Sequence, residues 1–279
     1  MRIARTAPDF QLSLQGSIGL VPTMGAFHDG HLSLFRAARA ENDTVVASLF
    51  VNAAQFGPDE DLDRYPRDEE RDARLAEAEG VDVLFAPPVE EVYPEGFATT
   101  VAVGELTQIL EGDRAQRGGT HFQGVTTVVT KLFNMTGPDV AYFGQKDAQQ
   151  ALVIRKLVRD LDMPVRIEVC PTIRDPDGLA LSSRNAYLSP EERERALALS
   201  RALRAAEAAV ADGTLDAAAV VAVARDELDR AGVEPDYLQL RSAIDLSPVE
   251  RVNGSALLAV AARVGRARLI DNAILGDRQ

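Results

Sequence analysis

The sequence predicts an α/β protein with a doubly wound parallel sheet, followed by a smaller α+β domain. Two observations predict this fold class. Through the first two thirds of the 279-residue chain, short apolar runs alternate with segments whose apolar residues recur at helical spacing. After about residue 171 the pattern changes to a turn-rich segment, two helical stretches and three strand-like runs.

Five runs are expected to form the parallel strands, because each is short, largely apolar and without polar alternation. They are SIGLVP (17–22), TVVASLFV (44–51), VDVLFAP (81–87), DVAYFG (139–144) and VRIEVCP (165–171). The helical segments are HLSLFRAARAE (31–41), PRDEERDARLAEAEG (66–80), GVTTVVTKLFNMTG (124–137) and KDAQQALVIRKLVRDLDM (146–163). Such alternation is typical of a doubly wound sheet.

The last third is expected to form the smaller domain. Ser189 is a suitable N-cap and Pro190 a suitable first residue for a helix that ends near residue 213. A second helix is expected from about residue 215 to 231, and the strand-like runs DYLQLRS, ALLAVAARV and ARLIDNAI follow. We place the boundary near Ile173, which gives domains of residues 1–173 and 174–279.

Composition narrows the class of protein. The net charge of −13 argues against duplex nucleic acid as the main partner, although it leaves room for a local nucleotide site. The N-terminal MRIARTAPDF has no long apolar stretch, so we expect neither a signal peptide nor a membrane span. The single cysteine, Cys170, excludes an intrachain disulfide and is expected to be buried on a strand. A cytoplasmic location fits.

The segment VPTMGAFHDGHLSL (21–34) holds two of the three histidines, at a predicted strand-to-helix turn. His28 and His31, three residues apart, are expected on the same side of the first helical turn, where N–H groups favour a phosphate. Gly25 permits a tight turn before them. A structural, helix-capping histidine is the alternative explanation. A zinc site is disfavoured, because the chain has only one other histidine and one cysteine.

Two further clusters carry groups suited to phosphate. In AYFGQKDAQQ (141–150), Lys146 and Asp147 are expected to open a helix at the carboxyl end of a strand, where α/β sheets bind ligands. Only three of the 30 basic residues are lysine, which draws attention to Lys146. In LSSRN (181–185), two hydroxyls and a guanidinium lie together and could close over a triphosphate. A solvated lysine and an ordinary surface loop are the alternatives.

In FVNAAQFGPDEDLDRYPRD (50–68), Asn52 and Gln55 can bind a carboxylate or hydroxyl without carrying charge. The acidic run 59–61 is interpreted as a solvated face rather than a metal site. Residues 118–122 are expected to form a mobile loop before a helix, and the role of His121 is left open. No dinucleotide fingerprint, Walker A motif or nucleophile elbow lies in the expected strand–helix context, which weakens nicotinamide, P-loop and serine-hydrolase functions.

Six motifs, in this order, resemble the pantoate–β-alanine ligase (pantothenate synthetase) family. They are PTMGAFHDGH, FVNAAQF, DLDRYPR, THFQGV, GQKDAQQ and DGLALSSRN, and the resemblance extends from Pro22 to the C-terminal LIDN. The family belongs to the nucleotidyltransferases with a HIGH-type signature, here residues 28–31, and its KMSKS-like element would be residues 182–184.

The resemblance implies a Rossmann-like fold and ATP-dependent condensation of (R)-pantoate with β-alanine. The reaction would pass through pantoyl adenylate and release pyrophosphate and then AMP. Mg²⁺ accompanying ATP, a homodimer and a cytoplasmic enzyme are also implied. No magnesium ligand is identified.

The resemblance further implies residue roles. ATP would be bound by Met24, Gly25, Ala26, Phe27, His28, Asp29, Gly30, His31, Gly144, Gln145, Lys146, Asp147, Ile173, Leu181, Ser182, Ser183 and Arg184. Within this set, the catalytic groups would be His28, His31, Lys146, Ser182, Ser183 and Arg184, with His31 as proton donor and Ile173 against adenine. Gln55 would bind pantoate and β-alanine, Gln150 would bind pantoate, and Asn52 would accompany them.

Some positions depart from the family pattern. Ala53 and Ala54 replace the expected proline and methionine, Gln145 replaces glutamate, Ala148 replaces an aromatic residue and Leu181 replaces methionine. These changes leave the polar and basic groups in place. Two alternatives stay open: a nucleotidyltransferase of the same fold with a stable adenylate product, and a non-catalytic nucleotide-binding module.

Overall fold

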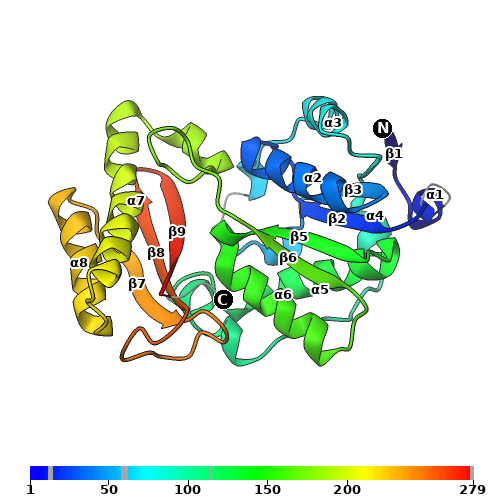
Figure 1. The fold of residues 1–279 in the computed structure, drawn as a ribbon. Coiled ribbons are helices and arrows are strands. Elements are labelled where there is room, and N and C mark those ends of the chain that lie inside the picture. Colours follow the sequence, from blue (N-terminus) through cyan, green and yellow to red (C-terminus); the bar gives the residue numbers. More distant parts are fainter. Residues whose placement is uncertain (12–14, 58–61, 114, 277–279) are drawn as a thin grey trace. The chain divides into compact units, whose positions relative to one another are not determined.

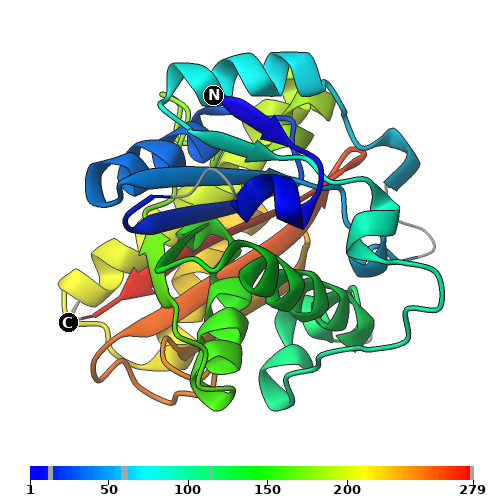
Figure 2. The same cartoon turned by 90° about the vertical axis from the view of Figure 1, so that its right-hand side faces the viewer.

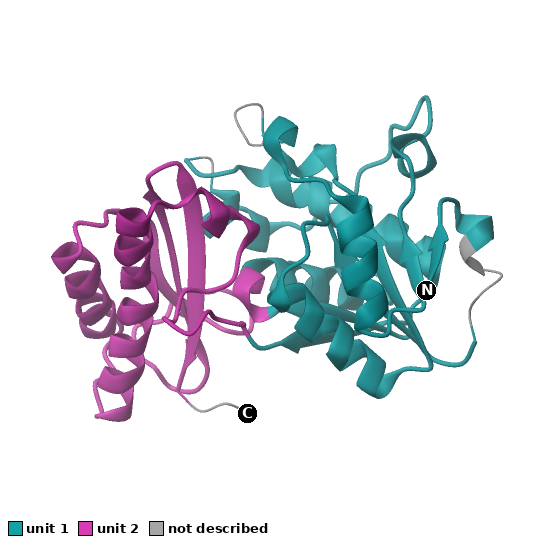
Figure 3. Cartoon of the chain, turned by 90° about the horizontal axis from the view of Figure 1, so that it is seen from above, with its two compact units in different colours: residues 1–144, 149–171 teal, residues 145–148, 172–279 magenta. Residues whose placement is uncertain are grey.

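The chain forms two compact units in the computed structural model, which describes residues 1–11, 15–57, 62–113 and 115–276 (Figures 1 and 3). Unit 1 comprises Met1–Gly144 and Gln149–Pro171, and unit 2 comprises Gln145–Ala148 and Thr172–Gln279. The short segment Gln145–Ala148 therefore belongs to a different unit from the chain on either side of it. The acidic run 59–61 lies outside the described residues.

Unit 1 is built on a six-stranded sheet in the order β1-β4-β3-β2-β5-β6, in which every neighbouring pair is parallel. The strands are β1 (Arg2–Ala4), β2 (Ile18–Thr23), β3 (Thr44–Leu49), β4 (Val83–Phe85), β5 (Val140–Gly144) and β6 (Arg166–Cys170). The five expected strands form, and the doubly wound parallel sheet is confirmed. The additional strand β1 has three residues, too few to show a pattern in the sequence.

Helices cover both faces of this sheet (Figure 2). On one face lie α2 (Asp29–Glu41) and α3 (Glu69–Ala78), and on the other lie α5 (Gly119–Thr136) and α6 (Ala148–Asp160). Successive residues of β2 point to opposite faces: Leu20 joins the cluster of α5 and α6, and Val21 joins that of α2. Two short helices, α1 (Ala7–Gln11) and α4 (Val89–Val92), complete the α-helices described in the unit.

The strand order reverses between β2 and β5. From β2 the chain proceeds to β3 and then β4 on one side, and it later returns to place β5 on the other side of β2. Ligands of open α/β sheets bind outside the carboxyl ends of the strands at such a switch point. The segment after β2, which begins at Met24, and the end of β5 at Gly144 are therefore brought to the binding edge of unit 1.

Unit 2 contains a three-stranded antiparallel sheet in the order β7-β8-β9, packed against two helices. Its elements are α7 (Pro190–Ala211), α8 (Ala217–Arg230), β7 (Pro235–Ser242), β8 (Ala256–Val264) and β9 (Ala267–Leu275). Ser189 caps α7 as expected, in a reciprocal capping box with Glu192. Leu258 and Val260, alternate residues of β8, pack in one core with Leu203 of α7. Within the described ranges, none of the helices has the length and apolarity needed to cross a membrane.

Candidate active site

The loop after β2 is held by a buried carboxylate from α3. Asp72, which is 1% exposed, accepts hydrogen bonds from the backbone N–H groups of Ala26 (2.7 Å) and Phe27 (2.8 Å). Gly25 (φ +90°) and Ala26 (φ +53°) both adopt left-handed conformations, and a Cβ added to Gly25 would meet Leu49 Cδ1 at 2.7 Å. The strained turn is thus stabilised by long-range contacts rather than by its own sequence.

The protonation of Asp72 reflects its burial. Desolvation raises the pKa of Asp72 above its ordinary value, and the two backbone hydrogen bonds oppose this shift only in part. The ionised side chain is therefore less stable in the folded protein than in water, yet it is the form that best accepts two N–H donors. A buried carboxyl with a raised pKa that shapes a loop is a functional candidate.

The two histidines of the loop form a mutual cap at the start of α2, which begins at Asp29, two residues before the predicted helical segment 31–41. His28 Nδ1 accepts from Gly30 N (3.2 Å), and His31 Nδ1 accepts from His28 N (3.4 Å). The ring centroids are 4.2 Å apart, so the imidazoles share one side of the turn as predicted. Because each Nδ1 accepts, the hydrogen of each neutral ring lies on Nε2, which can donate to an anion. The capping role and a phosphate-binding role are therefore compatible.

A chain of side-chain hydrogen bonds orients the amide of Gln55. The Tyr93 hydroxyl donates to Asn52 Oδ1 (2.7 Å), and Asn52 Nδ2 donates to Gln55 Oε1 (3.0 Å) and Gly124 O (3.1 Å). Gln55 Nε2 lies 3.1 Å from Met24 Sδ, a weak acceptor. Burial raises the pKa of Tyr93 to about 12, so its hydroxyl stays protonated and donates. Gln55 consequently presents an N–H donor beside Met24, the first residue of the segment Met24–His31, which we call the histidine loop.

His121 also supports Gln55, from a position that differs from the expected one. The predicted loop at residues 118–122 is wrong: α5 begins at Gly119, and His121 is 7% exposed in its first turn. Its Nε2 lies 3.0 Å from Arg117 Nη1, which can only donate. Nδ1 therefore carries the hydrogen and donates to the Gln55 carbonyl oxygen at 2.8 Å. The paired glycines suggested a loop, but Gly118 (φ +78°) is the N-cap of the helix.

The remaining predicted residues of unit 1 lie near the ends of β5 and α6. Gly144 is the last residue of β5, and Gln150 is half-buried in the first turn of α6. Its neighbour Gln149 is buried and tied to backbone groups of Leu106, Ile109 and Glu111. Gln149 thus has a structural role, whereas Gln150 remains a binding candidate.

Lys146 lies in a 3₁₀ turn, η5 (Gln145–Asp147), instead of opening α6, which begins at Ala148. The turn belongs to unit 2. The Lys146 side chain is 20% exposed, and its Nζ lies 3.7 Å from Asp147 Oδ2. An amine held at this distance from a carboxylate can also bind a phosphate oxygen.

The segment from Ile173 to Arg184 folds as a hairpin followed by a second 3₁₀ helix, η6 (Ser183–Tyr187). Leu181 N donates to Ile173 O at 3.0 Å, which joins the residue predicted to contact adenine to the start of the LSSRN motif. Ser182 caps η6 by accepting from Arg184 N at 3.3 Å. The motif is therefore an ordered turn.

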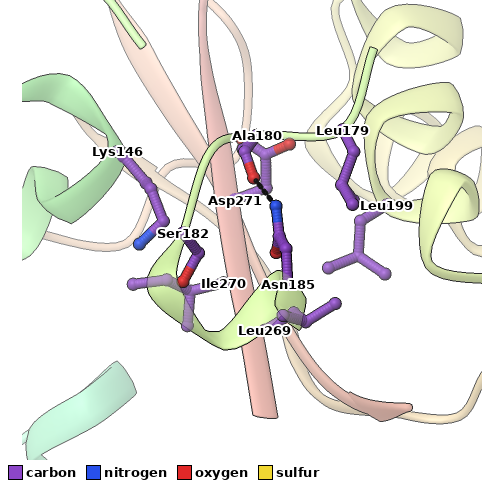
Figure 4. Close-up of a pocket in the computed structure, with 9 residues that line it drawn as sticks. All are labelled: Lys146, Leu179, Ala180, Ser182, Asn185, Leu199, Leu269, Ile270 and Asp271. Carbon is purple, nitrogen blue, oxygen red and sulfur yellow. Dashed lines mark hydrogen bonds between the residues drawn. The ribbon is translucent and has the colours of Figure 1, made fainter. Parts of the chain in front are cut away.

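Lys146 and Ser182 line one small cavity of about 10 Å³ in unit 2 (Figure 4). Asn185 lies there too; its Nδ2 donates to Ala180 O (3.0 Å) and its Oδ1 is buried without a hydrogen-bond partner. The structure thus brings together two predicted site residues that are 36 positions apart in the sequence. Across the described residues, by contrast, no group of three or more His, Cys, Asp or Glu side chains could hold a metal ion.

Comparisons with known proteins agree on one family. The family model described as pantoate-beta-alanine ligase matches residues 3–274. The pantothenate synthetase of Roseiflexus castenholzii is 53% identical over 279 residues, 99% of each chain, and that of Thermotoga neapolitana is 55% identical over 93% of this chain and 92% of its own.

Solved structures show the same likeness. Pantothenate synthetase from Thermus thermophilus matches with a TM-score of 0.94 and 49% identity, over 98% of this chain and 99% of that one. The pantoate-beta-alanine ligase of Francisella tularensis, complexed with beta-gamma ATP and beta-alanine, matches with a TM-score of 0.80 and 36% identity over 98% and 97%. On this agreement of sequence, motifs and fold, the chain belongs to the pantoate–β-alanine ligase family.

Proposed function

We propose that this enzyme condenses (R)-pantoate with β-alanine in two ATP-dependent steps. In the first, a pantoate carboxylate oxygen attacks the α-phosphorus of ATP, and pyrophosphate leaves with the electrons of the broken P–O bond. In the second, the β-alanine amine attacks the acyl carbon of pantoyl adenylate. The amine loses a proton, AMP leaves, and pantothenate is formed.

The contact between Gln55 and the histidine loop is the observation that best supports this function. Gln55 Nε2 reaches Met24 Sδ at 3.1 Å, so a donor suited to a carboxylate or hydroxyl lies against the loop that bears His28 and His31. The acceptor substrate would be bound by Gln55 and Gln150, whereas Asn52, which is buried and hydrogen-bonded to Tyr93, Gln55 and Gly124, would orient Gln55. An acid bound there would be close to the phosphate that it attacks, and such placement is a large part of catalysis.

Both histidines would act on the phosphates through Nε2. Backbone N–H groups occupy the Nδ1 atoms of His28 and His31, so each neutral ring offers an Nε2–H donor to negative charge that develops on phosphate oxygens. His31 is the proposed proton donor. The N–H groups at the start of α2 and the rest of the loop, Met24 to Gly30, would complete the nucleotide site.

The groups of unit 2 would bind the same nucleotide. Ile173 would contact adenine, and Lys146, Ser182, Ser183 and Arg184 would bind the triphosphate, with Gly144, Gln145, Asp147 and Leu181 beside it. We propose that residues 174–279 act as a lid. The shared cavity of Lys146 and Ser182 supports a joint role for these groups.

Magnesium would enter as part of the substrate Mg–ATP. Mg²⁺ is commonly bound through substrate phosphates and one or two carboxylates rather than by a protein cage. The absence of a metal-binding cluster among the described residues fits this mode. We also propose, from family resemblance, that the enzyme is a cytoplasmic homodimer, which sedimentation analysis and cell fractionation would test.

The function is tested by measuring AMP release with ATP, pantoate and β-alanine, omitting each in turn. We expect AMP release to require all three, and exchange of labelled pyrophosphate into ATP to require pantoate but not β-alanine. Exchange without pantoate would point to a different acceptor, and a failure of AMP release with all three substrates would point to a binding module.

His31→Ala tests the proposed proton donor. We expect kcat to fall about 10²- to 10³-fold, as for removal of one general-acid or electrostatic group. ATP affinity, measured by calorimetry, should change much less. Turnover near that of the wild type would remove His31 from the mechanism.

A further inference from the structure

Asn272 on β9 is hydrogen-bonded to the turn that carries Lys146. Its Nδ2 donates to the carbonyl oxygens of both Gln145 and Lys146, each at 2.9 Å. Its Oδ1 accepts from Gln145 Nε2, also at 2.9 Å. One amide therefore makes three hydrogen bonds to two consecutive residues, and all three residues belong to unit 2.

The orientation of this amide is determined by its partners. The carbonyl oxygens of Gln145 and Lys146 can only accept, so Asn272 Nδ2 must face them, and Oδ1 is left to accept from the Gln145 side-chain amide. Asn272 is 6% exposed and its three hydrogen bonds are partly buried, so breaking them would leave the buried Asn272 amide without partners. Glutamine at position 145, in place of the expected glutamate, supplies the side-chain N–H that Asn272 Oδ1 accepts.

The preceding residue of β9 anchors the second phosphate-binding segment. Asp271 accepts two hydrogen bonds from the Arg174 guanidinium, at 2.5 and 2.9 Å. Arg174 lies at the base of the hairpin that leads to Ser182, in an isolated bridge with Ala180. Adjacent residues of one strand thus hold the Lys146 turn and the hairpin of the LSSRN motif.

We infer that Asn272 is a positioning residue for Lys146: it holds the turn Gln145–Asp147 on β9, so that the Lys146 ammonium and the hydroxyls of LSSRN form one preassembled site for the ATP phosphates. This inference rests on the proposed phosphate-binding role of Lys146. A turn with no such anchor would have to be ordered when ATP binds, which would weaken binding and misplace the charge.

Asn272→Asp is the sharpest test, because the side chain keeps its shape but loses both donors and places negative charge against two carbonyl oxygens. We expect kcat/KM for ATP, measured by pantoate-dependent pyrophosphate exchange, to fall about 10- to 100-fold, as for a small misplacement of a catalytic group. KM for pantoate should stay within about twofold. Asn272→Ser, which retains one donor, should show a smaller fall in kcat/KM for ATP. It replaces Asn272→Asp as the test if the aspartate variant does not fold.

Asn42→Asp is the matched control. Asn42 is equally buried, at 6% exposure, and its Nδ2 likewise donates to a backbone carbonyl, that of Ala38 (2.8 Å), and to the Tyr142 hydroxyl (2.7 Å). It lies at the end of α2 in unit 1, at the opposite end of that helix from His28. We expect it to lower the melting temperature without a selective loss in the ATP parameters.

A double-mutant cycle with Lys146→Ala separates the inference from the function on which it rests. If Asn272 acts through Lys146, adding Asn272→Asp to Lys146→Ala should change kcat/KM for ATP by less than about twofold. Additive losses, or wild-type ATP parameters in folded Asn272→Asp, would overturn the positioning role. If Lys146→Ala alone leaves the ATP parameters unchanged, the proposed phosphate role of Lys146 fails instead.

Discussion

The directions of the hydrogen bonds around Gln55 are determined by two groups that can act in only one way, the Gly124 carbonyl oxygen and the Arg117 guanidinium. Because the Gly124 carbonyl oxygen can only accept, Asn52 Nδ2 faces it and Gln55 Oε1, and Asn52 Oδ1 is left to accept from the Tyr93 hydroxyl. Arg117 does the same for His121, whose Nδ1–H is then directed at the Gln55 carbonyl. At the residue scale, groups outside the proposed substrate-binding residues thus determine which atoms Gln55 offers to a ligand.

Tyr93→Phe should therefore raise KM for pantoate. The substitution removes only the hydroxyl and keeps the ring contacts with Phe50 (6.0 Å) and Phe97 (5.2 Å). Without its donor, Asn52 can rotate and release Gln55, so we expect KM for pantoate to rise about 3- to 10-fold, the effect of one neutral hydrogen bond, with KM for ATP unchanged. Steady-state kinetics with each substrate varied will measure both.

Tyr142→Phe is the control for this variant. Tyr142 is also buried and paired with an asparagine amide at 2.7 Å, and burial likewise raises its pKa to about 12. It lies outside the Asn52–Gln55 pair, so its loss should lower stability without affecting KM for pantoate. Equal effects of the two variants on KM would contradict the orientation argument.

Asp72→Asn tests the carboxylate that holds the histidine loop. The amide can accept through only one atom and places an N–H group against backbone donors, so we expect kcat/KM for ATP to fall about tenfold or more. Activity assays with ATP varied will show whether the loss is specific to the nucleotide. Unchanged ATP kinetics would mean that the loop keeps its shape without Asp72.

The stability of the same variant should depend on pH with a defined sign. The folded-state pKa of Asp72 is raised, so its favourable contribution is present below its ordinary pKa of about 4 and is lost as pH rises through the raised value. The asparagine variant lacks this titration. The excess stability of the wild type over the variant should therefore shrink as pH rises above about 4, and denaturant titrations at several pH values will measure it.

At the scale of elements, α5 approaches the 3₁₀ helix η1 (Ala53–Gln55) so closely that a glycine is required between them. A Cβ on Gly124 would meet Ala54 O at 2.3 Å and Gln55 N at 2.6 Å. Gly124 also accepts from Asn52 through its carbonyl oxygen. The packing of α5 against η1 therefore determines where the backbone of Gln55 lies.

Gly124→Ala should disturb both stability and pantoate binding. Relief of the clash requires η1 to move away from α5, so we expect a loss of about 1–3 kcal/mol in the free energy of unfolding and a raised KM for pantoate. Gly104→Ala is the matched control, because a Cβ at Gly104 would meet nothing within 4 Å. Chemical denaturation will measure the free energy of unfolding of both variants, and steady-state kinetics will measure KM for pantoate. Equal values of both quantities for Gly124→Ala and Gly104→Ala would rule out the close contact.

The elements and the histidine turn could be predicted from the sequence because their signals are local. Apolar runs mark β2 to β6, and the spacing of His28 and His31 places both rings on one side of the turn. The contacts that hold the site join distant positions, such as Asp72 with Ala26 and Asn272 with Lys146. In the sequence Asp72 is one of many acidic residues of a polar helix, and only the fold singles it out.

At the scale of the whole molecule, magnesium dependence should arise from the nucleotide rather than from the fold. If Mg²⁺ enters with ATP, as we propose, EDTA should abolish the reaction without lowering the melting temperature of the ligand-free enzyme. Mg²⁺ should raise the melting temperature only together with ATP, as binding to the folded state predicts. A fall in melting temperature with EDTA alone would reveal a resident metal.

The chain passes between its two units three times, after Gly144, after Ala148 and after Pro171. Cutting the gene at the last crossing would yield a C-terminal polypeptide that keeps Asn272 but has lost the two carbonyl groups to which it donates. Neither half would then carry the complete set of groups that we propose to bind the ATP phosphates. Split-protein designs, domain exchanges and fusions between homologues should consequently transplant residues 145–148 together with the C-terminal portion.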